Sequence, residues 1–105
     1  MIQTVVKRDG RIVGFNREKI AAAIRKAMLT TEAGEDEVLV YKIVDRIEFR
    51  GKEQSSVEEI QDMVELELMA SPRKEVAKSY IAYRDKRSIA RKAKTREMFL
   101  EIVEA

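Results

Sequence analysis

Residues 2–20 read IQTVVKRDGRIVGFNREKI, and the pattern of this stretch predicts the first elements of the chain. Apolar and polar side chains alternate over residues 2–7, as they do in a β-strand with one buried face. The dipeptide Asp9-Gly10 is typical of a tight turn with positive φ, and residues 12–15 then form a second short strand. The stretch therefore predicts a hairpin, which must pack on other elements because two strands alone are marginally stable.

A helix is predicted directly after the hairpin. Asn16 is a good N-cap, and Glu18 stands in the first turn, where the helix dipole favours an acid. The apolar residues that follow recur at the spacing of one helical face: Ile20, Ala23, Ile24, Ala27 and Met28. This pattern predicts a helix over residues 17–29.

Two more helices and a short extended segment follow. The second helix is expected over residues 35–49, with an inward face of Val40, Ile43, Val44 and Ile47. Residues 52–55 could add a third small strand to the hairpin. Ser56 and Glu59 have the spacing of a capping box, which opens a third helix over residues 57–70.

A fourth helix is predicted to begin with Ser71 as its N-cap and Pro72 at its first position. Its apolar pattern thins after Arg84, although helix-forming residues continue. We therefore expect a core domain over residues 1–90 and a helical linker over residues 91–105, which would lead into a domain outside this sequence.

The composition limits the chemistry. A chain of 105 residues suffices for one compact domain, and its 38% of charged residues favours a water-facing, helix-rich surface. With neither Cys nor His, the chain can form no disulfide, thiolate zinc site, Cys nucleophile or His general base. No apolar run approaches the length of a membrane span, and the N-terminus does not resemble a signal peptide. We expect a cytoplasmic domain with no membrane partner.

Charge is strongly segregated along the sequence. Residues 1–28 carry a net charge of +5, residues 29–71 of −8, residues 72–96 of +8 and residues 97–105 of −3. An anionic ligand would be attracted to the place where the two basic blocks meet. The alternative is that the charged helix faces simply neutralise each other.

Four residues suggest a phosphate site. Lys7 and Arg8 stand at the end of a strand beside the turn, Asn16 opens a helix, and Lys19 lies one turn further on. Free N–H groups and the positive dipole end make a helix N-terminus a natural anion site. Taken one at a time, these residues are better explained as a basic turn and an ordinary cap.

Taken together, they resemble a known family. The segments VVKRDG (residues 5–10), FNREKI (15–20), VEEIQDMVE (57–65) and YIAYR (80–84) are similar to the ATP-cone, a regulatory domain at the N-terminus of many ribonucleotide reductases. The resemblance covers residues 2–90. It implies a mainly helical α+β fold, in which four helices are capped by a small three-stranded mixed sheet.

The resemblance also implies a function. The ATP-cone binds ATP, which keeps the reductase active, or dATP, which shuts it off; Mg²⁺ could accompany either nucleotide. Residues 91–96 are similar to the segment leading into the catalytic domain of the anaerobic (class III) ribonucleoside-triphosphate reductases. The implied partners are adenine nucleotides and that catalytic domain, with association between copies of the parent chain. This piece would not itself be an enzyme, because the reaction needs cysteines and a radical glycine.

The resemblance implies which residues contact the nucleotide. It places Lys7 and Arg8 on the phosphates or just behind them. Asn16, Lys19 and Ile20 fall at the opposite wall, with Lys19 on phosphate and Ile20 near the base or sugar. The remaining implied contacts are Gln61 on the third helix and Tyr83, Arg84 and Lys86 on the fourth.

Two other functions stay open on the sequence alone. The basic block 72–96 could serve a nucleic-acid-binding or transcription-regulatory module. The apolar residues of Met98–Val103 could instead drive oligomerisation.

Overall fold

The computed structural model describes the backbone of residues 1–104 and the side chains of residues 1–92. The side chains of the predicted apolar patch Met98–Val103 therefore lie outside the described residues. In chain order the elements are β1 (Thr4–Val6), β2 (Ile12–Gly14), α1 (Arg17–Leu29), α2 (Glu37–Arg50), β3 (Gln54–Ser56), α3 (Val57–Ala70) and α4 (Lys74–Glu104).

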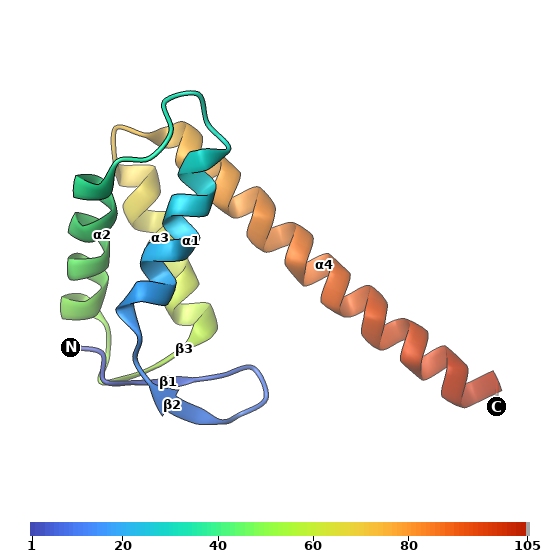
Figure 1. Ribbon diagram of the computed structural model, residues 1–105. Coiled ribbons are helices and arrows are strands. Elements are labelled where there is room, and N and C mark those ends of the chain that lie inside the picture. The colour runs from blue at the N-terminus through green and yellow to red at the C-terminus, as the bar shows by residue number, and fades with distance from the viewer. Residues whose placement is uncertain (105) are drawn as a thin grey trace.

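The four helices form a bundle with one long member. Helix α1 packs on α2 and α4, and α3 packs on the same two helices. Figure 1 shows the sheet lying across one end of the bundle and α4 running out of it. The 31-residue α4 accounts for much of the 53 Å long axis of the molecule. The predicted fold class is confirmed.

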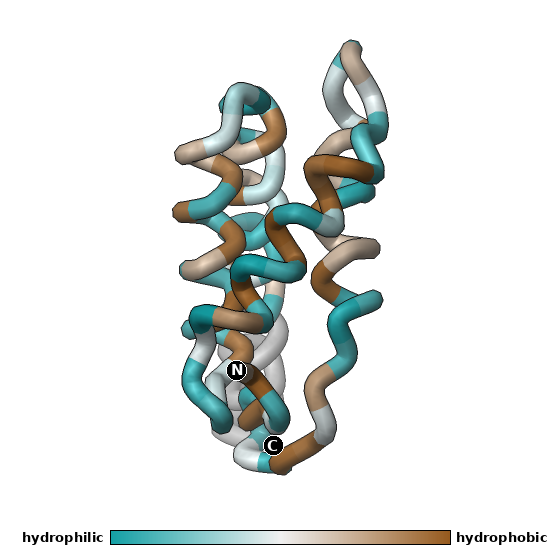
Figure 2. Tube along the Cα trace, turned by 90° about the vertical axis from the view of Figure 1, so that its left-hand side faces the viewer, coloured by the Kyte–Doolittle hydropathy of each residue, from teal (hydrophilic) through white to brown (hydrophobic). Residues whose placement is uncertain are grey.

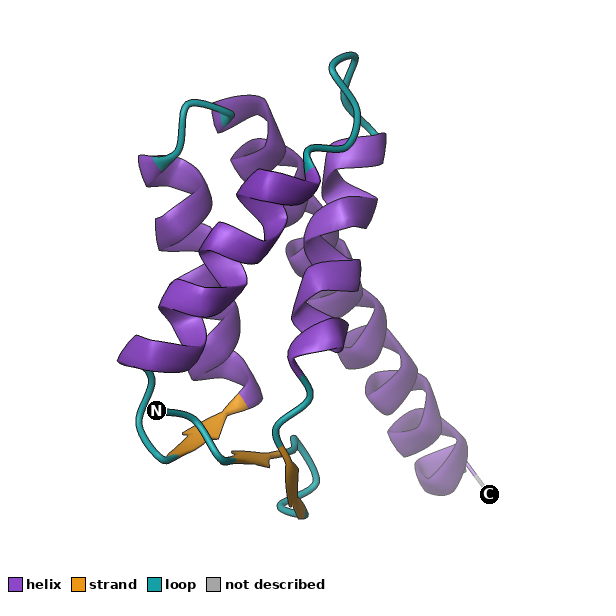
Figure 3. Ribbon diagram, turned by 60° about the vertical axis from the view of Figure 1, so that its left-hand side comes forward, coloured by secondary structure: helices purple, strands orange, loops and turns teal. Residues whose placement is uncertain are grey.

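The three short strands form a mixed sheet in the order β2-β1-β3 (Figure 3). Strand β1 pairs antiparallel with β2, where Val5 lies opposite Val13, and parallel with β3, where Val5 lies opposite Ser55. The third strand therefore exists as predicted, although it begins at Gln54 and not at residue 52. Because α3 follows β3 directly, the parallel pairing places the start of α3 beside the hairpin.

The hairpin turn is wider than the dipeptide pattern suggests. The N–H of Lys7 donates to Arg11 O (2.8 Å), and the N–H of Gly10 donates to Lys7 O (2.9 Å). Gly10 supplies the positive φ, at 89°. Asp9 contributes through its carboxylate, which accepts from the N–H of Arg11 (3.0 Å) and from Arg11 Nε (2.6 Å). The backbone bond from Arg11 is the main reason that the pKa of Asp9 lies below its ordinary value.

Helices α1 and α3 begin where the sequence predicts. Asn16 Oδ1 accepts from the N–H of Glu18 (3.1 Å) at the start of α1. At the start of α3, Ser56 Oγ accepts from the N–H of Glu59 (3.1 Å), and the Glu59 carboxylate accepts from the N–H of Ser56 (3.2 Å). These bonds satisfy N–H groups that have no partner inside a helix, and they confirm the predicted caps.

The predicted start of α4 is wrong. Ser71 ends α3 by donating its N–H (3.2 Å) and its hydroxyl (2.6 Å) to Leu68 O, and α4 begins only at Lys74. Ser71 is extended, with ψ at 164°, because a residue before proline disfavours the helical region. The intervening turn lets Arg73 Nη2 donate to Thr31 Oγ1 (2.9 Å) and Gly34 O (3.0 Å), which fastens the α1–α2 loop.

The start of α2 is also displaced. It begins at Glu37 and not at residue 35, because the carboxylate of Asp36 accepts from the N–H of Leu39 (3.2 Å) and makes Asp36 the cap. The helix ends at Arg50, one residue beyond the prediction.

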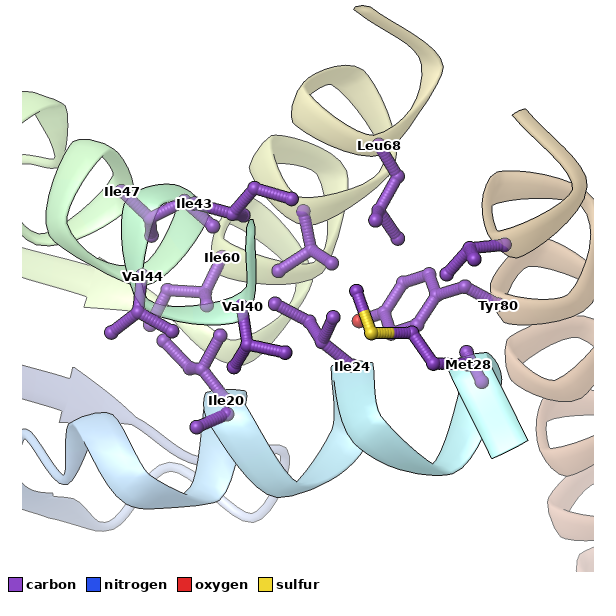
Figure 4. Packing of buried hydrophobic residues seen from close by; sticks show 14 of the residues in the cluster. Ile20, Ile24, Met28, Val40, Ile43, Val44, Ile47, Ile60, Leu68 and Tyr80 are labelled. Carbon is purple, nitrogen blue, oxygen red and sulfur yellow. The ribbon is translucent and has the colours of Figure 1, made fainter. Parts of the chain in front are cut away.

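One apolar core holds the bundle together. Figure 2 shows apolar and polar positions alternating along the helices, and Figure 4 shows side chains from all four helices pointing toward one another. The largest wholly buried side chains are Ile24, Met28, Ile47, Leu68, Val40, Val44, Val64 and Val76. In the described part of the chain, each helix is too short or too polar to cross a membrane.

Gly51 is needed for packing. A Cβ at this position would clash with Cγ1 and Cδ1 of Ile2, which is buried against the end of α2. We expect Gly51→Ala to lower the free energy of unfolding by about 1–3 kcal/mol, the usual cost of overpacking. Urea unfolding of the 105-residue chain measures this. Gly14→Ala is the matched control, because its Cβ would meet nothing within 4 Å; equal losses for both variants would contradict the prediction.

Candidate functional site

A cavity of about 230 Å³ lies between the hairpin, the start of α1 and the facing sides of α3 and α4. Its lining comes from five elements, the hairpin turn and the segment that joins β2 to α1. The residues are Val5, Lys7, Val13, Gly14, Phe15, Asn16, Lys19, Ile20, Ala23, Val57, Ile60, Gln61, Val64 and Tyr80.

Five of the nine residues predicted from the sequence line this cavity: Lys7, Asn16, Lys19, Ile20 and Gln61. The hairpin wall and the α1 wall thus share one space, although they are separated along the chain. The other four, Arg8, Tyr83, Arg84 and Lys86, are not among the lining residues.

Most of the lining is apolar, and sequence reasoning did not assign it to a site. Val5 and Val13 are paired across β1 and β2, and both line the cavity. Ile60, Val64 and Tyr80 line it from α3 and α4, where their apolar spacing along each helix indicates only a buried face. The periodicity was right about their burial but carries no signal that a cavity opens beside them.

The charges at this cavity are of one sign. Two of the lining residues are lysines, and none is acidic. Among residues 1–92, neither Lys7 nor Lys19 has a carboxylate within ion-pair distance, whereas Arg8, Arg17 and Arg84 all do.

Two helices begin at the cavity and add to this positive character. Asn16, the cap of α1, and Val57, the first residue of α3, both line it. The N–H groups of a first helical turn carry partial positive charge, which favours anions. The arrangement is therefore suited to an anionic group near the lysines and to a flat, weakly polar group against the apolar wall.

Arg8 does not line the cavity but stands next to two residues that do, Lys7 in the sequence and Gln61 through a hydrogen bond; we call this position the rim. Its Nη2 donates to Gln61 Oε1 (3.1 Å) and forms an ion pair with Glu58 Oε1 (2.8 Å). Arg8 is thereby tied to α3 beside a lining residue. The sequence predicts Arg8 and Gln61 as site residues but not Glu58, whose carboxylate connects Arg8 to Arg84 on α4.

Arg84 is held by a row of acids on α3. Its Nη1 contacts Asp62 (2.8 Å) and Glu65 (2.7 Å), and its Nη2 contacts Glu58 (2.6 Å). Burial lowers the pKa of Arg84, but the bonds to these three acids outweigh it, so the net pKa is raised and the charge is permanent.

The two remaining predicted residues face solvent. The side chain of Tyr83 is half exposed, and the guanidinium of Arg87 lies 5.9 Å from the centre of its ring. Lys86 is also exposed. Both therefore lie on the surface of α4, apart from the cavity.

Among the side chains of residues 1–92, no group of three Asp or Glu is placed to hold a metal ion.

A family model described as the ATP cone domain matches residues 3–89. The chain belongs to this family. The sequence resemblance is thereby confirmed, and the cavity can be considered as part of an ATP cone.

Relatives of this ATP cone are ribonucleotide reductases. The vitamin B12-dependent ribonucleoside-diphosphate reductase of Thermoplasma acidophilum is 49% identical over 102 residues, covering 90% of this chain and 13% of that protein. The ribonucleoside-diphosphate reductase subunit alpha of Chlamydia pneumoniae is 38% identical, and the match covers 91% of this chain and 10% of that protein. The anaerobic ribonucleoside-triphosphate reductase of Escherichia coli is 37% identical, and the match covers 91% of this chain and 14% of that protein. The chain thus spans only about an eighth of the length of these relatives.

Tyr80, which lines the cavity, makes the free energy of unfolding depend on pH. Burial raises its pKa to about 12, from an unfolded value of 10.0. The neutral phenol is favoured in the fold, so its stabilisation is complete below pH 10 and is lost as the pH rises from 10 toward 12. We expect a loss on the order of 2 kcal/mol, measured by urea unfolding at pH 9 and pH 12. Tyr80→Phe should lack this component; an equal loss in that variant would contradict the assignment.

Proposed function

We propose that this ATP cone is an allosteric sensor of adenine nucleotides and that the cavity between the hairpin and α1 binds the nucleotide. The observation that carries the proposal is the pair Lys7 and Lys19, which line one cavity and form no ion pair with a carboxylate of residues 1–92. Unpaired cations beside an apolar wall are what a triphosphate attached to a flat base requires.

Each wall has its own role in this proposal. Lys7 and Lys19 contact the phosphates, and the amides at the start of α1 behind Asn16 add N–H donors. Ile20 and the apolar residues on α3 pack against the base or sugar, while Gln61 supplies an amide that can hydrogen-bond to it. Mg²⁺ would accompany the triphosphate as its counter-ion.

The nucleotide controls a larger enzyme. The relatives are reductases of which a chain like this covers about an eighth, so we propose that residues 1–90 regulate the overall activity of a parent ribonucleotide reductase. In this arrangement ATP sustains activity and dATP inhibits it. Helix α4 continues past residue 90, and residues 91–105 would connect the sensor to the catalytic domain of the parent.

We further propose the anaerobic ribonucleoside-triphosphate class for the parent, on the basis of residues 91–96. The matching relatives belong to reductases of several kinds, so identity over the ATP cone does not select among them. The sequence of the parent beyond residue 105 decides this point: a catalytic domain with a radical glycine supports the anaerobic class, and a cobalamin-dependent domain contradicts it.

Removing either cavity lysine should weaken nucleotide binding. Charge-assisted contacts to phosphate are worth roughly 1.5–3 kcal/mol, so Lys7→Ala and Lys19→Ala should each raise the Kd for ATP about 10- to 150-fold. Isothermal titration of the 105-residue chain with ATP and dATP measures this. Lys26→Ala, which removes an exposed lysine from the last turn of α1, is the control and should bind like the wild type.

Two results would contradict the nucleotide site. One is a folded wild-type chain that binds neither ATP nor dATP at millimolar concentration. The other is equal binding by the Lys7, Lys19 and Lys26 variants. Salt-sensitive binding of duplex DNA without nucleotide binding would instead favour the nucleic-acid alternative.

In the parent enzyme, the sensor should be separable from catalysis. We expect deletion of residues 1–90 to abolish inhibition by dATP while reductase activity remains, because the regulatory ligand loses its site but the reacting groups lie elsewhere. Turnover assays of the parent with and without dATP test this. Retained dATP inhibition in the deletion variant would show that the effector binds another domain.

A further inference from the structure

Glu58 occupies a junction between three elements. It lies in the first turn of α3, and its two carboxylate oxygens contact two different arginines. Oε1 pairs with Arg8 Nη2 (2.8 Å) on the hairpin turn, and Oε2 pairs with Arg84 Nη2 (2.6 Å) on α4. Both arginines were predicted from the sequence to contact the nucleotide, yet neither lines the cavity.

We propose that Glu58 is a positioning residue that holds Arg8 at the rim of the cavity, and that Arg84 acts on the nucleotide only through Glu58. This inference rests on the proposed function, because it concerns the same ligand. It changes the role that the resemblance implies for Arg84, from a direct contact to a support.

The contacts of Arg8 leave it able to bind a phosphate while it is held. Its two contacts, with Glu58 and Gln61, both use Nη2. A guanidinium carries five N–H donors, so those on Nη1 and Nε can still meet a phosphate oxygen. Glu58 thus fixes a flexible side chain on an exposed turn without consuming the donors that the ligand needs.

The guanidinium of Arg84 is bound to α3 by ion pairs. It contacts acids at Glu58, Asp62 and Glu65, which lie on one face of that helix. The hydrogen bond from Arg84 is the main reason that the pKa of Glu58 is lowered; burial opposes this effect, and the charges of Arg8 and Arg91 add to it. Glu58 therefore stays ionised at neutral pH, although it stands close to the proposed phosphate site.

Glu58 has two opposite effects on the binding of a triphosphate. Its negative charge repels the phosphates, and its hold on Arg8 favours binding by saving the entropy of ordering that side chain. The repulsion is weakened because two guanidinium groups neutralise the carboxylate and because the side chain is 55% exposed to screening solvent. Ordering a long side chain costs enough to weaken binding roughly three- to tenfold when the anchor is lost. We therefore expect the positioning effect to dominate.

The first test is a double-mutant cycle between Arg8 and Glu58 on the 105-residue chain, with the Kd for ATP measured by calorimetry. Glu58→Gln should weaken ATP binding roughly three- to tenfold. Arg8→Gln should weaken it at least as much, and the double variant should match Arg8→Gln within about twofold, since Glu58 acts through Arg8. Binding of adenosine, which has no phosphate, should be the same in all four proteins.

The second test addresses Arg84 with its charge kept. Arg84→Lys puts a single nitrogen where Nη1 and Nη2 contact different acids, so it should lose the hold on Glu58. We expect ATP binding to weaken in the wild-type background and to change no further when Glu58→Gln is already present. Glu67→Gln is the matched control: this α3 carboxylate pairs with Arg46 and Arg50 of α2, away from the cavity, and should leave the Kd unchanged.

The outcomes are decisive in each case. Unchanged or tighter ATP binding by folded Glu58→Gln overturns the positioning role and leaves the nucleotide site intact. A loss caused by Arg84→Lys that persists in the Glu58→Gln background shows that Arg84 touches the ligand directly. Absence of ATP and dATP binding by the wild-type chain overturns this inference together with the proposed function.

Discussion

The parallel pairing of β1 with β3 is the interaction on which the site depends. It brings the hairpin across the end of the bundle where both α1 and α3 begin. Without it, Lys7 on the hairpin and Gln61 on α3 would have no common cavity. The pairing also accounts for Gly51, since the chain must pass close over the buried Ile2 before it enters β3. A few backbone bonds thus convert a helical bundle into a bundle with a lined opening.

The arginines and the lysines near the cavity have different roles. The arginines near the opening are tied to acids, as Arg8 is to Glu58 and Arg84 is to three carboxylates of α3. The two lysines of the lining have no such partner among the described side chains. An arginine can bind several acceptors from one fork, whereas a lysine is a compact point charge. The arginines therefore join structural elements, and the lysines are left for an anionic ligand.

Much of the fold could be read from local patterns. The caps at Asn16 and Ser56 were predictable because a side-chain oxygen reaches an N–H two or three residues away. The start of α4 was not, because Ser71 ends the preceding helix and Arg73 is used to fasten the α1–α2 loop, distant in sequence. At the site, Lys7, Asn16 and Lys19 stood out beside turn and cap signals. Val13 and Tyr80 did not, because a cavity wall and a core position share the same apolar periodicity.

Periodicity, caps and a local motif are enough to predict the helices, the hairpin and the family. The cavity that Lys7 and Lys19 share, and the meeting of Arg8 and Arg84 at Glu58 on its margin, follow from tertiary packing. The difference is one of range along the chain. Helix and turn signals act over a few residues, whereas an ion pair between the hairpin, α3 and α4 depends on how elements far apart in the chain are packed.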